Sequence, residues 1–196
     1  MLGFPIGVPA ERAQQNKLGE AFMGYIRSVV TAVAVVVGIP IAGFADPQVD
    51  RGKYLVTLGG CNDCHTPGYF LGHPDFDRRL GGSEVGFSIP GLGVFVGRNL
   101  TPDKQTGLGS WTDEEIVTAI TTGKRPDGRE LAPIMPWRAF SALTKEDAEA
   151  IAVYLKSLPP VHNEIPGPFG PDEKPTVLVF TIVPGDVYAA MPKPPK

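Results

Sequence analysis

Cys61-Asn62-Asp63-Cys64-His65 is the stretch that decides how the chain is organised, because it places two thiols and an imidazole close together. In a helical turn, residues i, i+3 and i+4 share one face, so the three groups point the same way. A covalently attached haem needs this arrangement, with two thioether bonds to the porphyrin and the adjacent His on the iron. The motif therefore predicts one haem c on Cys61 and Cys64, with His65 as the proximal iron ligand.

Two other uses of a Cys-x-x-Cys pair fit the chain less well. A dithiol oxidoreductase would need a strand–helix–strand context, and no such alternation surrounds the motif. A structural zinc site needs four ligands, usually with a second Cys pair or two closely spaced His residues. Cys61 and Cys64 are the only cysteines, and the other two histidines, His73 and His162, lie far apart in the sequence. Haem attachment is the favoured interpretation.

The first 45 residues have the organisation of a secretory leader. An uncharged run from Ser28 to Phe44 follows a polar, basic start, and its apolar core has about the length of a secretory h-region. We expect cleavage after Ala45, with Met23 as an alternative start of the leader. An uncleaved anchor helix is the other interpretation, because the run is at the lower edge of membrane-spanning length. In both cases the folded part is expected to be periplasmic.

Three helices are expected after the leader, each with start and stop signals. The first runs from Pro47 to Leu58 and ends at a Gly-Gly pair. The second starts at Thr112, has Glu115 as its capping-box partner and stops at Gly123. The third starts at Thr144 and ends before a Pro-Pro pair. The expected apolar side of the first helix consists of Val49, Tyr54, Leu55 and Leu58.

The segments outside these helices are rich in Gly and Pro. Residues 66–110 are expected to form a long loop that wraps one side and edge of the haem. The tail after residue 160 is again Pro-rich, and its apolar run over residues 176–183 either adds a strand or lies along the surface. One mostly helical, loop-rich domain is therefore expected.

The second iron ligand decides the function, because a haem with two protein ligands mostly passes electrons, whereas a five-coordinate haem binds small molecules. Met135 is favoured, since prolines on both sides stiffen its loop and a soft thioether favours Fe(II). A methionine that only fills the core is the alternative. The weaker candidates are Met191, His73 and His162.

Charge and motif content exclude several classes of function. The formal net charge of −3 provides no basic face for nucleic acid. No dinucleotide fingerprint, phosphate loop or nucleophile elbow is present. The pairs Glu114-Glu115 and Glu146-Asp147 are typical of first-turn acids that complement helix dipoles. No residue is assigned to catalysis, and the chain is expected to be an electron carrier and not an enzyme.

Several motifs downstream of the cysteines resemble a known family. They are Asn99–Asp103, Thr106–Trp111, Asp127–Arg129, Met135–Trp137 and a helix over Leu143–Leu158 followed by Pro-Pro-Val. In this order they resemble a class I c-type cytochrome, and in detail a single haem module of the cytochrome subunits of membrane-associated alcohol and sugar dehydrogenases. The resemblance covers about residues 48–161.

The resemblance implies a mostly α, cytochrome c-like fold, with three main helices and long Gly- and Pro-rich loops around one covalently attached haem. It implies that Cys61 and Cys64 form the thioether links and that His65 and Met135 are the proximal and distal iron ligands.

The resemblance also implies roles for residues outside the haem motif. Gly52 is expected to let the first helix cross closely against the last, near Tyr154. The side chains expected to approach the haem propionates are Arg98, Asn99 and Trp111.

The sequence thus predicts a leader over residues 1–45, a cytochrome c domain over 46–161 and a Pro-rich C-terminal extension over 162–196. The expected function is one-electron transfer between a dehydrogenase or quinol-oxidising complex and a downstream cytochrome or oxidase of a respiratory chain. A haem subunit fixed in a dehydrogenase complex is the alternative, although the family's subunits carry three modules and this chain has one motif. A haem enzyme or sensor with a displaceable Met135 is favoured less, since the sequence shows no distal acid–base residue. The expected partners are redox proteins, with membrane association through a retained leader.

Overall fold

The computed structural model describes residues 46–192, which belong to one compact unit. The expected leader over residues 1–45, with its cleavage site, lies outside the described residues, as do the last four residues. None of the helices that the structure describes is long and apolar enough to cross a membrane.

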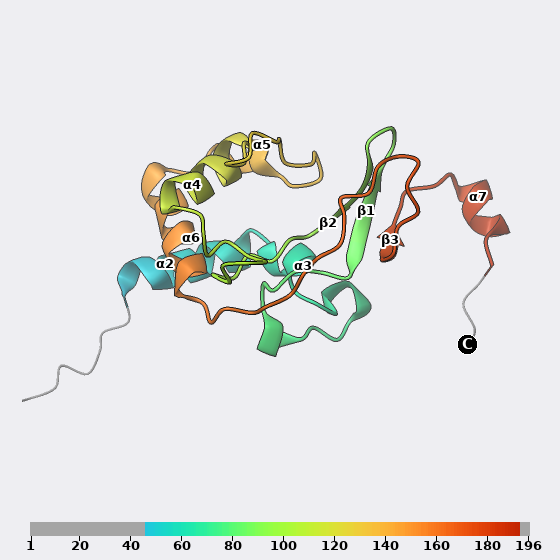
Figure 1. Ribbon diagram of the computed structural model, residues 1–196. Coiled ribbons are helices and arrows are strands. Elements are labelled where there is room, and N and C mark those ends of the chain that lie inside the picture. Colours follow the sequence, from blue (N-terminus) through green and yellow to red (C-terminus); the bar gives the residue numbers. More distant parts are fainter. Residues whose placement is uncertain (1–45, 193–196) are drawn as a thin grey trace, which may run out of the picture. The chain divides into compact units, whose positions relative to one another are not determined.

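The described chain is rich in helices and contains one small sheet (Figure 1). The longer helices are α2 (Pro47–Leu58), α4 (Asp113–Thr122) and α6 (Lys145–Ser157). The shorter helical segments are α3 (Cys61–His65), α5 (Trp137–Phe140), α7 (Gly185–Ala190) and the 3-10 turns η1 (Tyr69–Leu71) and η2 (Phe76–Arg78). The strands are β1 (Val85–Ile89), β2 (Gly93–Val96) and β3 (Leu178–Phe180).

The three longer helices begin and end where the sequence predicts. Thr112 accepts a hydrogen bond from the Glu115 backbone N–H at 3.2 Å, and the Glu115 carboxylate accepts one from the Thr112 N–H at 2.8 Å. These two bonds satisfy donors that the first turn of α4 leaves without helical partners. Gly123 ends α4 in the left-handed conformation, with φ 75°. The predicted capping box and stop are therefore confirmed.

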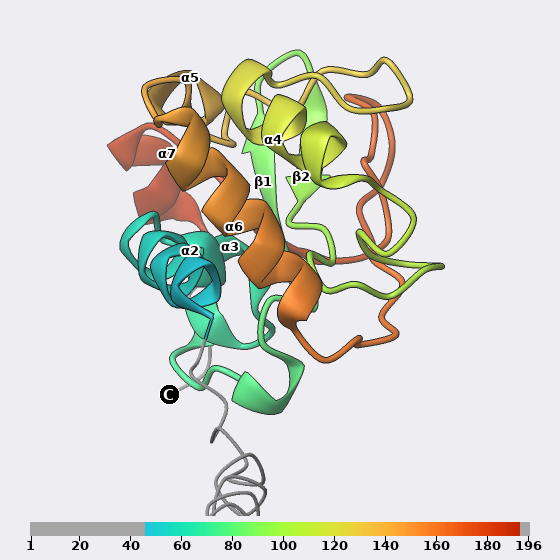
Figure 2. The same ribbon diagram turned by 90° about the vertical axis from the view of Figure 1, so that its left-hand side faces the viewer.

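The core lies where α2, α4 and α6 meet. Figure 2 shows α6 running between α2 and α4, and α6 packs against both helices. The buried apolar side chains of this core are Val56, Leu80, Leu108, Ile116, Ile151, Ala152, Tyr154 and Leu155. Cys61 is partly buried and packs against the same cluster, so the start of α3 is attached to the helical core.

α2 and α6 cross with their backbones nearly in contact at Gly52. A Cβ at this position would overlap the carbonyl oxygen of Ala150 and lie 2.6 Å from the Cβ of Tyr154. Beside the crossing, the Arg51 guanidinium donates two hydrogen bonds to the Asp147 carboxylate, at 2.8 and 2.9 Å. The expected close approach of the first helix to the last is confirmed.

The buried side of α2 agrees with the prediction only in part, because Val49 and Leu55 pack against the core but Tyr54 and Leu58 do not. Tyr54 and Leu58 are 56% and 69% exposed, whereas Val56 is 1% exposed. The crossing at Gly52 explains the difference, because the residue one turn later on the same face is Val56. The Arg51 guanidinium lies over the Tyr54 ring, 5.5 Å from its centroid, on the exposed side of the helix.

The Gly- and Pro-rich stretch over residues 66–110 contains a β-hairpin, so the expectation of a continuous loop is wrong in this part. β1 and β2 pair antiparallel. At the turn, the Leu92 N–H donates to the carbonyl of Ile89 at 3.0 Å, and Gly91 has φ 74°. A Pro-Gly pair at these positions is typical of a type II turn. Pro90 and Gly91 therefore form the turn that connects the paired strands β1 and β2.

The apolar run over residues 176–183 supplies a third strand. β3 pairs in parallel with β1, which gives the strand order β2-β1-β3. Phe87 of β1 lies opposite Phe95 of β2 and Phe180 of β3. The ring of Phe87 lies 5.4 Å from that of Phe70 and 5.7 Å from that of Phe180. Part of the C-terminal extension is therefore built into the sheet.

We expect Gly52→Ala to destabilise the protein by about 2 kcal/mol, because the added methyl group forces α2 and α6 apart. Urea unfolding of the purified protein measures the change. Gly185→Ala is the control, since a Cβ at Gly185 meets no atom within 4 Å, and it should change the stability by less than about 0.5 kcal/mol. Equal effects of the two substitutions would contradict the close crossing.

Candidate haem-binding site

The Cys-x-x-Cys-His motif forms a single helical turn, α3. It begins after Gly60, which has φ 67° and turns the chain sharply out of α2. The turn ends at Thr66, where the backbone becomes extended. Because α3 is helical, Cys61, Cys64 and His65 share one face, as the spacing predicts. The two thiols are free and partly buried.

The imidazole of His65 is held by the backbone. Its Nδ1 lies 2.7 Å from the carbonyl oxygen of Arg98, so Nδ1 carries the proton and donates to this carbonyl. This tautomer leaves Nε2 with a free lone pair for a metal. Burial lowers the pKa of His65 and so favours the neutral, ligating form.

Two glycines allow the chain to pack this closely around α3. A Cβ at Gly97 would overlap the carbonyl oxygen of Cys64, so only glycine lets the chain after β2 approach α3 and present the next carbonyl to His65. On the other side, the N–H of Gly82 donates to the carbonyl of His65 at 2.8 Å. Sequence reasoning missed both glycines, because their partners are distant in the chain and leave no local pattern.

The thiols differ from those of a dithiol oxidoreductase. Burial raises the pKa of Cys61 to about 11 and also raises that of Cys64. Redox-active Cys-x-x-Cys pairs have depressed thiol pKa values, because the thiolate is the nucleophile. The raised pKa values therefore argue against a redox-active dithiol at α3.

Met135 lies in the segment that joins α4 to α5 and is partly buried. In Figures 1 and 2 this segment lies near the top of the unit, whereas α3 lies lower. Two backbone hydrogen bonds shape the loop: the Met135 N–H donates to Ala132 at 2.9 Å, and the Trp137 N–H donates to Met135 at 2.8 Å. The Trp137 ring packs directly on Gly123, which anchors the loop to the end of α4.

The weaker ligand candidates are exposed. Met191 follows α7 and is 41% exposed. The His162 side chain is 64% exposed, and its Nδ1 lies 3.5 Å from an Asp103 oxygen. His73 is exposed beside η1. None of these three has the partly buried position of Met135.

Two features of the described residues fit an acidic ligand such as a haem with its propionates. Trp137 Nε1 is buried without a hydrogen-bond partner, which is rare for such a donor. The guanidinium groups of Arg125 and Arg129 both pair with Asp127, whose pKa they hold down at about 2. Arg125 also lies over the ring of Trp111, 5.3 Å from its centroid. Two cations thus share one carboxylate.

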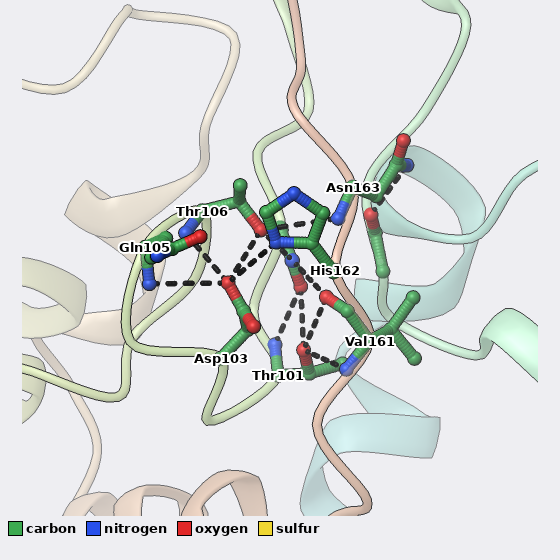
Figure 3. A network of polar contacts seen from close by, with 9 residues as sticks. Thr101, Asp103, Gln105, Thr106, Val161, His162 and Asn163 are labelled. Atoms are coloured by element: carbon green, nitrogen blue, oxygen red, sulfur yellow. Dashed lines mark hydrogen bonds and ion pairs between the residues drawn. The ribbon is translucent and has the colours of Figure 1, made fainter.

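A polar network fastens the segment after α6 to the loop that follows Arg98 (Figure 3). Asn99 is 1% exposed, and its amide donates to the carbonyl of Val161 at 2.6 Å and to Thr106 Oγ1 at 2.9 Å. Its Oδ1 accepts from the N–H and the hydroxyl of Thr101, at 2.9 and 2.8 Å. Both amide hydrogens and the Oδ1 of Asn99 are therefore used within the protein, and its approach to a propionate stays a prediction.

A pocket of about 780 Å³ lies between the segment after α3 and the C-terminal extension. Charged side chains line it, among them those of Asp75, Arg78, Glu84 and Glu164. None of the expected haem residues contributes to its wall. Among the residues that the structure describes, no group of three or more His, Cys, Asp or Glu side chains is arranged to hold a metal ion.

Similarity to known proteins agrees with the motif and its surroundings. The chain is 33% identical over 129 residues to the fructose dehydrogenase cytochrome subunit of Gluconobacter japonicus, covering 63% of this chain and 25% of the relative. It is 32% identical over 150 residues to the cytochrome c subunit of a quinone alcohol dehydrogenase of Gluconacetobacter polyoxogenes, covering 74% and 29%. It is 36% identical over 126 residues to a dihaem cytochrome c of Cereibacter sphaeroides, covering 62% and 39%.

These relatives confirm the predicted resemblance to a c-type cytochrome module. More particularly, the chain resembles the cytochrome c subunits of alcohol and sugar dehydrogenases. It spans between a quarter and two fifths of the length of the three relatives described. No family model matches the chain.

We expect Asn99→Ala to destabilise the protein by about 3 kcal/mol, because it leaves the buried N–H of Thr101 without its acceptor and removes the Asn99 hydrogen bonds to Val161 and Thr106. Urea unfolding at neutral pH measures the loss. The control is Gln105→Ala, since only the backbone N–H of this exposed residue joins the network, and it should shift stability by less than about 0.5 kcal/mol. A small effect at Asn99 would show that the network does not fasten the two segments.

Proposed function

We propose that this chain binds one haem c covalently and transfers single electrons. Cys61 and Cys64 would hold the haem by thioether bonds, and His65 and Met135 would ligate its iron. When bound, the haem supplies one-electron exchange between Fe(III) and Fe(II). The observation that carries the proposal is the hydrogen bond from His65 Nδ1 to the Arg98 carbonyl, because it presents Nε2 for a metal.

The protein's own contribution is to hold the two ligands in fixed positions. His65 is held through its ring N–H and through its own carbonyl, which accepts from Gly82. Met135 is restricted by the prolines on either side and by the packing of Trp137 on Gly123. Ligands that move little between the two oxidation states keep the reorganisation cost of electron transfer low.

The Arg125–Asp127–Arg129 group and Trp137 support binding of an acidic cofactor. With one carboxylate between two guanidinium groups, the group carries an excess positive charge that a propionate can neutralise. Trp137 Nε1 supplies a further donor without a protein acceptor. Two protein ligands on the iron leave no position for a substrate, which favours an electron carrier over a haem enzyme or sensor.

The proposed partners are redox proteins on the periplasmic side of the membrane. A dehydrogenase or quinol-oxidising complex would donate the electron, and a cytochrome or oxidase would accept it. The expected leader and the thioether attachment both support this location. The relatives favour a second candidate, a haem subunit fixed in a complex, since several of them are cytochrome subunits of dehydrogenases. Stoichiometric co-purification with a dehydrogenase would favour that second candidate.

Met135→Ala tests the iron ligation. We expect the purified ferric variant to lose the weak red charge-transfer band of a Met-ligated haem. Its midpoint potential should fall by an amount on the order of 100 mV, because a thioether stabilises Fe(II). A redox-poised absorbance titration measures both changes.

Met191→Ala is the matched control, because Met191 is the other methionine within the described residues and is 41% exposed. It should leave the band and the potential unchanged. An unchanged spectrum and potential in Met135→Ala would contradict the proposed ligand pair.

A further inference from the structure

The first part of the C-terminal extension packs beside the backbone of His65. Ile165 is 7% exposed, and its side chain fills the space beside Gly82, where a Cβ would overlap it. The N–H of Gly82 in turn donates to the carbonyl of His65 at 2.8 Å. Ile165 therefore packs against Gly82, which is hydrogen-bonded directly to His65, the expected proximal ligand.

A second contact joins the extension to the strand that leads toward His65. Phe169 and Val94 exchange two backbone hydrogen bonds, at 2.9 and 3.0 Å. Val94 lies in β2, and the chain runs from this strand directly into Gly97 and Arg98. The extension thus restrains the segment that contains Arg98, whose carbonyl accepts the hydrogen bond from His65 Nδ1.

The third contact passes through Arg98 itself. Its guanidinium donates to the carbonyl oxygens of Ile165 and Gly167 in the extension. Its own backbone carbonyl accepts the hydrogen bond of His65 Nδ1 at 2.7 Å. The planar guanidinium suits two acceptors at once. One residue therefore bonds the extension with its side chain and the expected iron ligand with its backbone.

We propose that the C-terminal extension is a positioning element for the proximal ligand and acts on His65 through Arg98 and Gly82. The proposal rests on the proposed function, in which His65 ligates iron. A strong hydrogen bond from Nδ1 to a carbonyl makes the imidazole a more basic ligand. A more basic ligand favours Fe(III) and lowers the potential. Loosening the extension should therefore raise the potential.

Two substitutions test the proposal without changing the charge. Arg98→Lys keeps the positive charge but loses the planar pair of donors. Ile165→Ala removes packing against Gly82 and involves no charged group. In both, the ratio of Fe(II) to Fe(III) at the wild-type midpoint should rise by up to about tenfold, which is ~59 mV for a one-electron couple.

Exchange of the His65 Nδ1 proton, followed by NMR in the reduced protein, gives a second readout. It should become several-fold faster in both variants, while exchange of the backbone amides in α2 stays unchanged. If the extension only stabilised the whole fold, the substitutions would speed exchange of both the His65 Nδ1 proton and the α2 amides, and they would not raise the midpoint potential.

Arg51→Lys is the matched control. Arg51 also makes a two-pronged contact, with Asp147, and has no bond to the segments around His65. It should change neither the potential nor the exchange of the His65 proton. The proposal would be overturned if the Arg98→Lys and Ile165→Ala proteins fold and keep the wild-type midpoint potential and the wild-type exchange rate of the His65 Nδ1 proton. A wild-type protein that carries no haem would instead refute the proposed function, and the absorbance spectrum distinguishes this result.

Discussion

The hydrogen bond from His65 Nδ1 to the carbonyl of Arg98 is the interaction on which the rest of the site depends. It selects the imidazole tautomer and so presents Nε2 for a metal. It forms only because Gly97 has no side chain, since any Cβ there would overlap the carbonyl of Cys64. Contacts from the hairpin and from the C-terminal extension meet at the same point, where they restrain Arg98 and Gly82.

The described residues divide into a packed helical frame and the loops attached to it. The frame is set by the backbone crossing of α2 and α6 at Gly52, and Cys61 packs against its core. The loop that carries Met135 is fastened to the same frame, because Trp137 packs on Gly123, the C-cap of α4. Both expected ligand segments are thus held by one core. This arrangement suits the proposed electron transfer, because the same ligands would have to hold the iron in two oxidation states.

Local signals made the helices predictable from the sequence. The capping box of Thr112 and the Gly123 stop act within one turn, and the spacing of the haem motif acts within α3. The β-hairpin was harder to predict from the sequence, since its Pro90-Gly91 turn lies in a Gly- and Pro-rich stretch that has the composition of a loop.

Contacts between distant segments could not be predicted in the same way. The exposed side of α2 follows from its crossing with α6, and the acceptor of the His65 proton is a backbone carbonyl that any residue could supply. The polar network of Asn99 is also a contact between distant segments, because its partner Val161 lies more than sixty residues later in the chain. Such contacts depend on how the loops are brought together and leave no pattern in the neighbouring sequence.

Mass spectrometry of the tryptic peptide that contains α3 tests the central claim most directly. Lys53 and Arg78 bracket residues 54–78, which contain Cys61 and Cys64 and no other trypsin site. In protein purified from a host that attaches haem to secreted cytochromes, this peptide should carry the mass of one haem joined to both cysteines. An unmodified peptide with two free thiols would contradict the account.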